Sequence, residues 1–514
     1  MNYIRDKSLR LFQQIPMSEI RKKSLKATIW IYVGFVFGAA NTYFLAHKNW
    51  FTPDQNGLTR ALIDISLLIY AFSSFGTTNY LYKFFPYYQD NLEPKKNDLL
   101  TTAFSIAVIG FALTALGIWA LNPLIVKKFG TNSSLLVEYV YWTIPMGFFI
   151  LTFQLLEAYS YGFGKGVVSS LLRETVIRLY TLIIILLKIA DVIDFHSFII
   201  LFAFQYAVIV VIMAIYLRKE GKLWISFKTS RVTRKYRKKI IAMLSLTFVV
   251  VIVTILRQSI DGLVLAAKQN LGKVGIFGLA SYMVSILQAP FRSLVAITIP
   301  LLSRAWKEKN LPEIQRIYQR SSINMLGFSL FVYGCILMNF EHGISVFGIN
   351  PAYLEGKWVF GLLGLVTIIE LGTGVNGQII ATSTYWRFEL WTSLILTLMI
   401  IPLSYYFTVK YGIIGPAMAN LISFSVYNFI RFRFLWKKFG LQPFSIKTLE
   451  LLFIALFAFS ISYFSVIKLS GILAIASSIL IFSGIYGSLF LWRDISPDVK
   501  QLFQTLKQRI IKNK

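Results

Sequence analysis

Long apolar runs alternate with short polar segments along almost the whole chain of 514 residues. A helix needs about 20 predominantly apolar residues to cross the hydrocarbon core of a bilayer. Runs of that length predict an all-α integral membrane protein with about 14 transmembrane helices. The expected spans are 27–46, 60–83, 99–121, 138–161, 167–187, 195–217, 240–266, 276–300, 321–340, 358–380, 388–407, 412–430, 449–467 and 471–492.

The two chain ends are polar segments with amphipathic patterns. Residues 1–26 are basic and lack the short apolar run and cleavage site of a secretory leader. Near the other end, Ser496 is a favourable N-cap and Pro497 suits the first helical position. Both segments are expected to lie on the inner leaflet as amphipathic helices, with a solvated tail as the alternative. Their apolar residues are Ile4, Leu9, Leu11, Phe12 and Ile15, and Val499, Leu502, Phe503, Leu506 and Ile510.

The amino-acid composition excludes several other classes of protein. The chain is 56% hydrophobic and 15% charged, with a mean hydropathy of +0.63. A water-soluble fold of this size could not hide that much apolar surface, and disordered, collagen-like and coiled-coil chains have other compositions. The single cysteine, Cys335, excludes an internal disulfide. With only three histidines we expect no metal site, and no cofactor is indicated.

The net charge of +29 suggests nucleic acid binding until the basic residues are placed on the spans. With the N-terminus in the cytoplasm, 38 of the 52 Lys and Arg fall on cytoplasmic segments and nine on the opposite side. This bias is the positive-inside rule, so we expect both termini in the cytoplasm, contact with anionic membrane lipids, and no nucleic acid partner.

A basic loop divides the spans into two groups. The sixth span is followed by a cytoplasmic linker at 218–239 that carries ten basic residues. The predicted organisation is two six-helix lobes plus two C-terminal helices, since repeated halves are common in transporters. Its segments are the amphipathic 1–26, the first lobe 27–217, the linker 218–239, the second lobe 240–430, the last two spans 431–492 and the tail 493–514.

No segment has the size or the motif of a catalytic or nucleotide-binding domain. The loops are short, and the chain has neither a P-loop nor a glycine-rich phosphate fingerprint after a strand. We therefore expect a protein that is not an enzyme and does not hydrolyse ATP.

Ionisable groups inside membrane spans are costly and point to function by default. Arg60 and Asp64 lie four residues apart in the second span, and Arg257 and Asp261 repeat this spacing in the seventh. Residues at this spacing share a helical face. The two pairs predict either the lining of one polar space or self-neutralised structural pairs.

The fifth span contains Arg173, Glu174 and Arg178. Glu174 precedes Arg178 by four residues, which is the favourable order for an ion pair. Arg173 is then expected to be the residual positive group. The cluster is interpreted as the wall of a polar cavity, with a structural pair as the alternative.

Arg292 has no acidic residue in its own span, so its partner must come from another helix, a ligand or water. Arginine presents a planar fork suited to phosphate or carboxylate. We expect Arg292 to be the principal anion-binding residue, with pairing to Glu157 or Glu370 as the alternative.

Glu370 lies near the centre of the tenth span and precedes a run of small and polar residues that includes Gly374, Asn376 and Gly377. Such a run can unwind or bend a helix. Glu370, Asn376 and Glu174 are therefore candidates for coupling to protons, sodium or the membrane potential. The alternative is small-residue packing with a salt bridge.

Four segments resemble those of a known group. Together they are similar to the polysaccharide-biosynthesis transporters of the multidrug/oligosaccharidyl-lipid/polysaccharide (MOP) flippase superfamily, and most similar to O-antigen-type lipid-linked oligosaccharide flippases. The segments are 57–61 (GLTRA), 84–86 (FFP), 275–282 (GIFGLASY) and 411–417 (YGIIGPA).

The resemblance implies a two-lobed helical fold with a central cavity that works by alternating access. It implies a cargo of oligosaccharide on undecaprenyl diphosphate, moved from the inner to the outer leaflet of a bacterial inner membrane. Other polysaccharide-assembly membrane proteins would be partners. Arg60 and Arg292 resemble arginines of the lipid II flippases in the superfamily, whereas the first span has Asn41 and no arginine.

Two alternatives remain open. One is a cation-coupled multidrug exporter of the same fold, which predicts a net acidic cavity. The other is a membrane-embedded polysaccharide polymerase or ligase, which would need a large external loop with catalytic groups.

Overall fold

The computed structural model describes residues 17–501, and this part of the chain is built from helices. The apolar residues predicted to form an amphipathic N-terminal segment lie outside the described residues. So does the tail beyond Gln501. At the start of that tail, the helix begins at Pro497 and Ser496 caps it, because its hydroxyl accepts from the backbone N–H of Val499 at 3.3 Å. The predicted cap is confirmed.

Eleven helices in the described part are long and apolar enough to cross a membrane. The remaining three predicted spans also coincide with helices. Span 27–46 lies within the first described helix, whose apolar part is Val33–Ala46. Span 167–187 contains a π-turn within a continuous helical segment, and span 412–430 coincides with a longer helix that carries basic residues at its end. The chain is therefore an all-α, multi-pass membrane protein.

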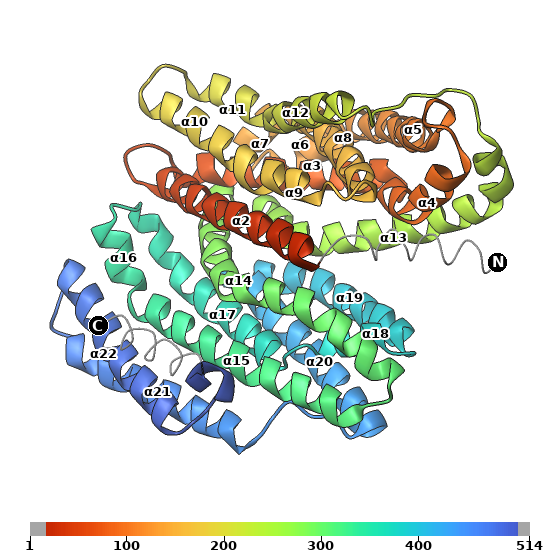
Figure 1. Cartoon of the computed structure of the whole chain (residues 1–514). Coiled ribbons are helices and arrows are strands. Elements are labelled where there is room, and N and C mark those ends of the chain that lie inside the picture. Colours follow the sequence, from red (N-terminus) through yellow and green to blue (C-terminus); the bar gives the residue numbers. More distant parts are fainter. Residues whose placement is uncertain (1–16, 502–514) are drawn as a thin grey trace, which may run out of the picture. The chain divides into compact units, whose positions relative to one another are not determined.

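The chain divides into two compact units. Unit 1 contains the described residues up to Leu45 together with Leu58–Ser259, and unit 2 contains Ala46–Gly57 together with the described residues from Ile260 onward. Helices α3 and α13 each contribute residues to both units. Figure 1 shows the helices coloured along the chain.

The elements that lie wholly or mostly in unit 1 are α2 (Met17–Ala46), α3 (Pro53–Ser74), α4 (Thr77–Asn91), η1 (Pro94–Lys96), α5 (Leu99–Ala120), α6 (Asn122–Phe129), α7 (Ser134–Tyr139), η2 (Val140–Trp142), α8 (Thr143–Gly162), α9 (Gly166–Leu171), η3 (Leu172–Val176), α10 (Ile177–Ile189), α11 (Phe195–Ala203), α12 (Gln205–Lys219) and α13 (Arg231–Lys268). Its core is rich in aromatic side chains. Tyr80, Tyr88, Phe153 and Phe198 are among those fully buried.

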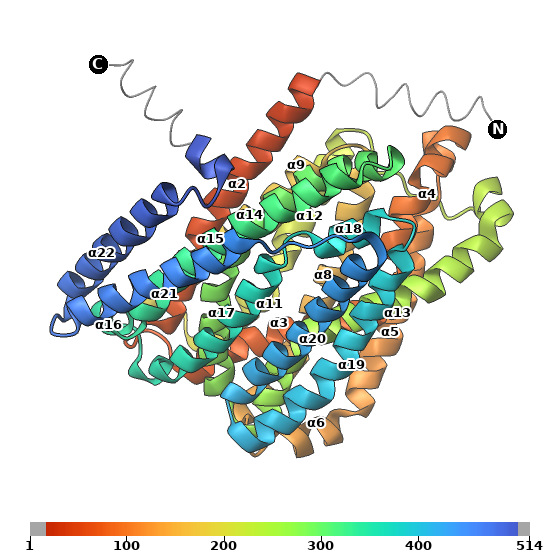
Figure 2. The same cartoon turned by 90° about the horizontal axis from the view of Figure 1, so that it is seen from below.

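The elements of unit 2 are α14 (Leu271–Lys307), α15 (Leu311–Met338), α16 (Phe340–Val346), η4 (Pro351–Glu355), α17 (Gly356–Gly372), α18 (Asn376–Thr382), α19 (Trp386–Tyr411), α20 (Ile414–Phe439), α21 (Ile446–Val466) and α22 (Gly471–Trp492). Helices α19 and α20 pack side by side, and α21 packs beside α22 (Figure 2). Leu326, Leu451, Phe482 and Tyr486 form the core between α15 and the last two helices.

The predicted span 358–380 is not one continuous helix. Helix α17 ends at Gly372, a turn covers residues 373–375, and α18 begins at Asn376. Gly374 takes a φ of 58°, a left-handed conformation that side chains other than glycine adopt at a cost. A Cβ there would lie 2.7 Å from the Ser321 hydroxyl and 3.0 Å from the Ser322 nitrogen. The break is thus fixed both by backbone conformation and by close packing against α15.

Candidate substrate and ion sites in the membrane helices

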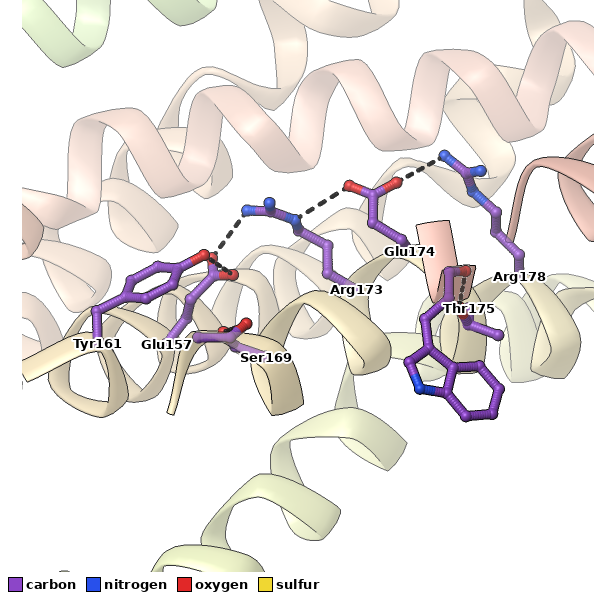
Figure 3. Close-up of polar contacts among 9 residues, drawn as sticks. Glu157, Tyr161, Ser169, Arg173, Glu174, Thr175 and Arg178 are labelled. Carbon is purple, nitrogen blue, oxygen red and sulfur yellow. Dashed lines mark hydrogen bonds and ion pairs between the residues drawn. The ribbon is translucent and has the colours of Figure 1, made fainter. Parts of the chain in front are cut away.

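Four charged side chains of alternating sign form a line in unit 1 (Figure 3). Arg173 donates to Glu157 at 3.0 Å and lies 3.4 Å from Glu174, which in turn accepts from Arg178 at 3.0 Å. Glu157 comes from α8 and is 1% exposed, and Tyr161 also donates to it at 3.3 Å. Each inner member of the line is shared by two neighbours, so the four charges neutralise one another.

The line is held on an unusual piece of helix. Arg173 and Glu174 lie in η3, a five-residue π-turn between α9 and α10. Single π-turns inside α-helices are rare and frequently mark functional sites. The backbone of α2 comes so close that a Cβ on Gly34 would lie 2.1 Å from the carbonyl oxygen of Glu174. Only glycine permits this approach.

Helix α2 also makes polar contacts with the helix that carries the line. The hydroxyl of Thr175 donates to the carbonyl of Trp30 at 2.6 Å, and the amide of Asn41 donates to the carbonyl of Arg178 at 2.9 Å. The guanidinium of Arg178 lies over the ring of Phe35, 5.3 Å from its centroid. Asn41 is therefore a residue that fixes the backbone of Arg178, and its amide is engaged within the protein.

The structure places Asn41, which the sequence analysis named separately, beside the predicted cluster of Arg173, Glu174 and Arg178. The predicted pairing of Glu174 with Arg178 is confirmed. The expectation that Arg173 remains as the residual positive group is wrong, because Glu157 reaches it from another helix. Contacts between helices are not visible in sequence spacing, which explains why the part of Glu157 in this line was missed.

Arg60 and Asp64 form the expected pair in α3, with a separation of 3.6 Å. The arginine side chain is 44% exposed whereas the carboxylate is 6% exposed. The carboxylate is therefore fixed in the protein, while the guanidinium can reach a ligand or water.

The second predicted pair is arranged differently. In unit 2, Asp261 accepts from the Ser404 hydroxyl at 2.8 Å and from the Asn420 amide at 2.7 Å. Arg257 is half-buried in unit 1 and forms no hydrogen bond or ion pair with any described residue. The two Arg-xxx-Asp motifs therefore do not form equivalent pairs, because helix α20 supplies Asp261 with an amide donor.

Arg292 is exposed on α14 and has no hydrogen bond or ion pair with the described part of the chain. Within unit 2, the pairing to Glu370 that was considered as an alternative does not occur among the described residues. An arginine in an apolar helix without a protein partner needs water or an anion. Arg292 thus stays a candidate for anion binding.

Unit 2 contains a polar cavity of about 340 Å³ at the break between α17 and α18. Two of its lining residues, Glu370 and Asn376, were proposed from the sequence. Three others were not: Glu389 on α19, and Tyr427 and Arg431 on α20.

Arg431 is enclosed on several sides. It forms an ion pair with Glu389, its guanidinium lies over the ring of Tyr427 at 3.8 Å, and it donates to the side-chain oxygen of Asn376 at 3.4 Å. The Tyr427 hydroxyl donates to Glu389 at 3.2 Å. A Cβ on Gly377 would lie 2.9 Å from the guanidinium, so the small residue leaves room for the arginine.

The backbone and side-chain polar groups at the helix break form hydrogen bonds within unit 2. Ser322 donates to the carbonyl of Gly372, and the N–H of Val375 donates to the Ser321 hydroxyl at 3.3 Å. Thr373 and Asn376 both donate to the side-chain oxygen of Asn428 at 3.1 Å. The predicted break is present, but its Gly372 carbonyl is bound by a hydroxyl. Among the described residues, no three His, Cys, Asp or Glu lie close enough to hold a metal ion.

Arg431 was missed because it follows the apolar run 412–430 and was counted with a cytoplasmic segment, although α20 continues past it to Phe439. Glu389 was missed because it stands at the edge of the predicted span 388–407 and was not singled out among the charges inside the spans. Tyr427 and Arg431 lie four residues apart and share a helical face, and this spacing was the signal that could have identified Arg431.

No family model matches the sequence, and no curated protein matches it. Solved structures do resemble the fold. The lipid II flippase MurJ, in an inward closed conformation, superposes with a TM-score of 0.72 at 16% identity, covering 92% of this chain and 99% of that one.

Two further structures belong to the MOP superfamily. An inward-facing multidrug resistance MATE family transporter gives a TM-score of 0.58 at 13% identity, covering 79% of this chain and 96% of that chain. A MOP superfamily transporter from Pyrococcus furiosus gives 0.55 at 12% identity, covering 82% and 95%. At these identities the likeness shows the fold alone, which this chain shares with these three membrane proteins.

Proposed function

We propose that the protein is a flippase that moves undecaprenyl-diphosphate-linked oligosaccharide from the inner to the outer leaflet by alternating access. It would serve surface polysaccharide biosynthesis in a bacterial inner membrane, with both termini cytoplasmic. The observation that carries this proposal is the extent of the likeness to a lipid-linked substrate flippase. The TM-score of 0.72 over 92% of the chain exceeds the 0.58 obtained with the multidrug transporter.

The arginines support an anionic cargo. Arg292 is exposed and Arg60 is half-exposed, and both lie in apolar helices. Guanidinium groups bind phosphate oxygens in a bidentate manner, and a diphosphate offers several. The lipid tail would stay in the bilayer while the sugars occupy a polar cavity. The first span has Asn41 and no arginine, unlike the pattern that the resemblance gives for lipid II flippases, and this supports a cargo other than lipid II.

Coupling of transport to an ion or to the membrane potential is consistent with polar residues in both units. A negative-inside potential contributes about 2.3 kcal/mol per charge per 100 mV, and it favours outward movement of an anionic head group. Glu370 and Asn376 line the cavity of unit 2, and Glu174 lies in the charged line of unit 1. Flipping in proteoliposomes should respond to an imposed potential, pH gradient or sodium gradient. A rate that ignores all three contradicts this coupling.

Substitution of Arg292 tests the proposed function directly. Arg292→Ala should lower surface polysaccharide severalfold in cells without lowering the amount of protein in the membrane. Arg292→Lys should restore little, because a lysine cannot bind in a bidentate manner. Arg304→Ala is the matched control, since Arg304 lies on the same helix and pairs with Glu308 near its end. Normal polysaccharide in the Arg292→Ala strain would remove Arg292 from the site.

A cation-coupled multidrug exporter is the second candidate. It is favoured by the lining of the unit 2 cavity, where Glu370 and Glu389 face a single arginine, Arg431. The likeness to a MATE transporter is compatible with it. Drug efflux by the purified chain in proteoliposomes, without flipping of lipid-linked sugar, would decide for the exporter.

The polymerase or ligase alternative has less support, since the similar structures named above are transporters rather than enzymes. Product length in a deletion strain separates it from a flippase. Loss of external sugar indicates a flippase, whereas single repeat units outside the cell indicate a polymerase.

A further inference from the structure

A second cavity, of about 660 Å³, lies in unit 1 where the loop between α4 and α5 meets the loop between α12 and α13. It is far more basic than the cavity of unit 2. Its lining includes four cationic side chains and one carboxylate, namely Lys95, Lys96, Lys228, Arg231 and Glu93. Neither the transport proposal nor the charged line of unit 1 uses these residues.

Two of the cations are available to a ligand. Glu93 is bonded to Lys96 at 2.9 Å, and this hydrogen bond lowers the pKa of the carboxyl, which therefore stays charged. Arg231 donates to the carbonyl of Asn91 at 2.7 Å. Lys95 and Lys228 are exposed and form no hydrogen bond or ion pair with any residue between 17 and 501. The cavity therefore keeps a surplus of positive charge.

The second of these loops is held in a defined shape although it contains no helix. The Tyr159 hydroxyl donates to the carbonyl of Lys222 at 3.1 Å, and the N–H of Ser226 donates to Thr101 at 3.0 Å. At its end the N–H of Ser230 donates to Asp98 at 2.9 Å. Asp98 is 2% exposed. A cationic cavity whose walls are already ordered loses little entropy when it binds.

The charge and position of this cavity suit a phosphate group. Helix α13 begins at Arg231, so the positive end of its dipole adds to the lysines. The hydroxyl of Ser230 caps that helix by accepting from the N–H of Thr233 at 3.2 Å.

Apolar residues on the same loop indicate where the phosphate comes from. Ile225 is 67% exposed and Phe227 is 87% exposed, immediately before Lys228. Alternate residues of an extended segment point to the same side, and here the alternate residues Trp224 and Ser226 are less exposed. Exposed apolar side chains beside lysines are typical of segments that insert into the membrane interface.

We propose that residues 91–96 and 225–231 form a binding site for the phosphate of an anionic membrane lipid. Phe227 and Ile225 enter the interface, and Lys95 and Lys228 hold the headgroup. The site requires these loops to face the inner leaflet, as the distribution of basic residues predicts. It does not depend on which substrate the protein transports.

Lipid binding to the purified full chain in an uncharged detergent tests the proposal, with native mass spectrometry as the measurement. The probes are phosphatidylglycerol, zwitterionic phosphatidylcholine and inorganic pyrophosphate. Lys95→Gln/Lys228→Gln should weaken phosphatidylglycerol binding roughly 25-fold, since each lysine near an anionic lipid contributes a factor of about five. The matched control is Lys238→Gln/Lys239→Gln, which removes the same charge from exposed positions of α13 that do not line the cavity.

A third variant separates the lipid from a free phosphate. Phe227→Ser should weaken phosphatidylglycerol binding and leave pyrophosphate binding unchanged. The proposal is overturned if both double variants lose the same affinity, which would show diffuse attraction only. The assignment to a lipid is overturned if phosphatidylglycerol binds no more tightly than phosphatidylcholine. It is also overturned if Lys95→Gln/Lys228→Gln weakens the binding of pyrophosphate but not that of phosphatidylglycerol.

Discussion

In unit 1, four charges of alternating sign lie along one line, whereas in unit 2 a single arginine is enclosed by a carboxylate, a tyrosine ring and an asparagine. Both arrangements place charge among apolar helices. The side chains of Arg173 and Arg178 remain 40% and 27% exposed, while that of Arg431 is 9% exposed. The first arrangement leaves its two guanidinium groups partly open to the surroundings, whereas the second encloses its arginine beside the helix break.

The two regions also distort their helices by different means. Unit 1 uses the π-turn η3, which keeps the helix continuous. In unit 2 the helix ends and a new helix begins after a three-residue turn that contains Gly374. A continuous but distorted helix keeps its charges in a row, while a broken helix opens a cavity beside the arginine.

Removal of Arg431 should have the largest effect on stability. Arg431→Ala leaves Glu389 without its ion pair, and breaking a buried pair costs about 3–5 kcal/mol. Thermal unfolding of the purified chain in detergent measures this. Arg178→Ala is the comparison, because its partner Glu174 keeps Arg173. Equal losses in the two variants would contradict the distinction between an enclosed and an open cluster.

Gly374→Ala is expected to have the next largest effect. Its left-handed conformation costs roughly 1–2 kcal/mol for alanine, and the contacts of the added methyl with α15 add about 1–3 kcal/mol. Gly440→Ala is the matched control. Gly440 has a φ of 69° and no atom within 4 Å of the position of its Cβ, so it isolates the conformational cost. If both variants unfold at the same temperature, close packing does not fix the break.

The smallest effect is expected in the charged line. Arg173→Gln removes the ion pair of Glu157, but Tyr161 still donates to this carboxylate and the partly exposed position of Arg173 admits water, so the loss is about 1–2 kcal/mol. The double variant Glu157→Gln/Arg173→Gln should recover part of it. A double-mutant cycle on the free energy of unfolding gives the coupling. Additive losses would show that the two side chains do not stabilise each other.

Hydropathy predicted where helices lie because the bilayer requires a fixed apolar length. It predicted less well where they end. The apolar run stops near Ile430, yet α20 continues for more than two turns, since basic residues are tolerated at a helix end that reaches water. Arg431 was therefore placed outside the membrane, and its pairing with Glu389 was missed.

The spacing of residues along the sequence predicted the contacts and the break that lie within a single helical segment. The pairs Arg60–Asp64 and Glu174–Arg178 and the break after Gly372 follow from local pattern. The links from Glu157 to Arg173, from Asn41 to Arg178 and from Asp261 to Asn420 join residues far apart in sequence. Only the packing of helices brings these side chains within reach of one another.

The π-turn in unit 1 makes the geometry of the charged line depend on the length of the segment as well as on its charged residues. Each residue of an α-helix turns the chain by about 100°, so one residue more or fewer rotates everything that follows. Arg178 lies beside Glu174 and its guanidinium lies over the ring of Phe35. This placement therefore depends on the number of residues in the segment after Leu171 as well as on their identities. A deletion there would change the register of α10 against α2 while leaving every charged residue in the sequence.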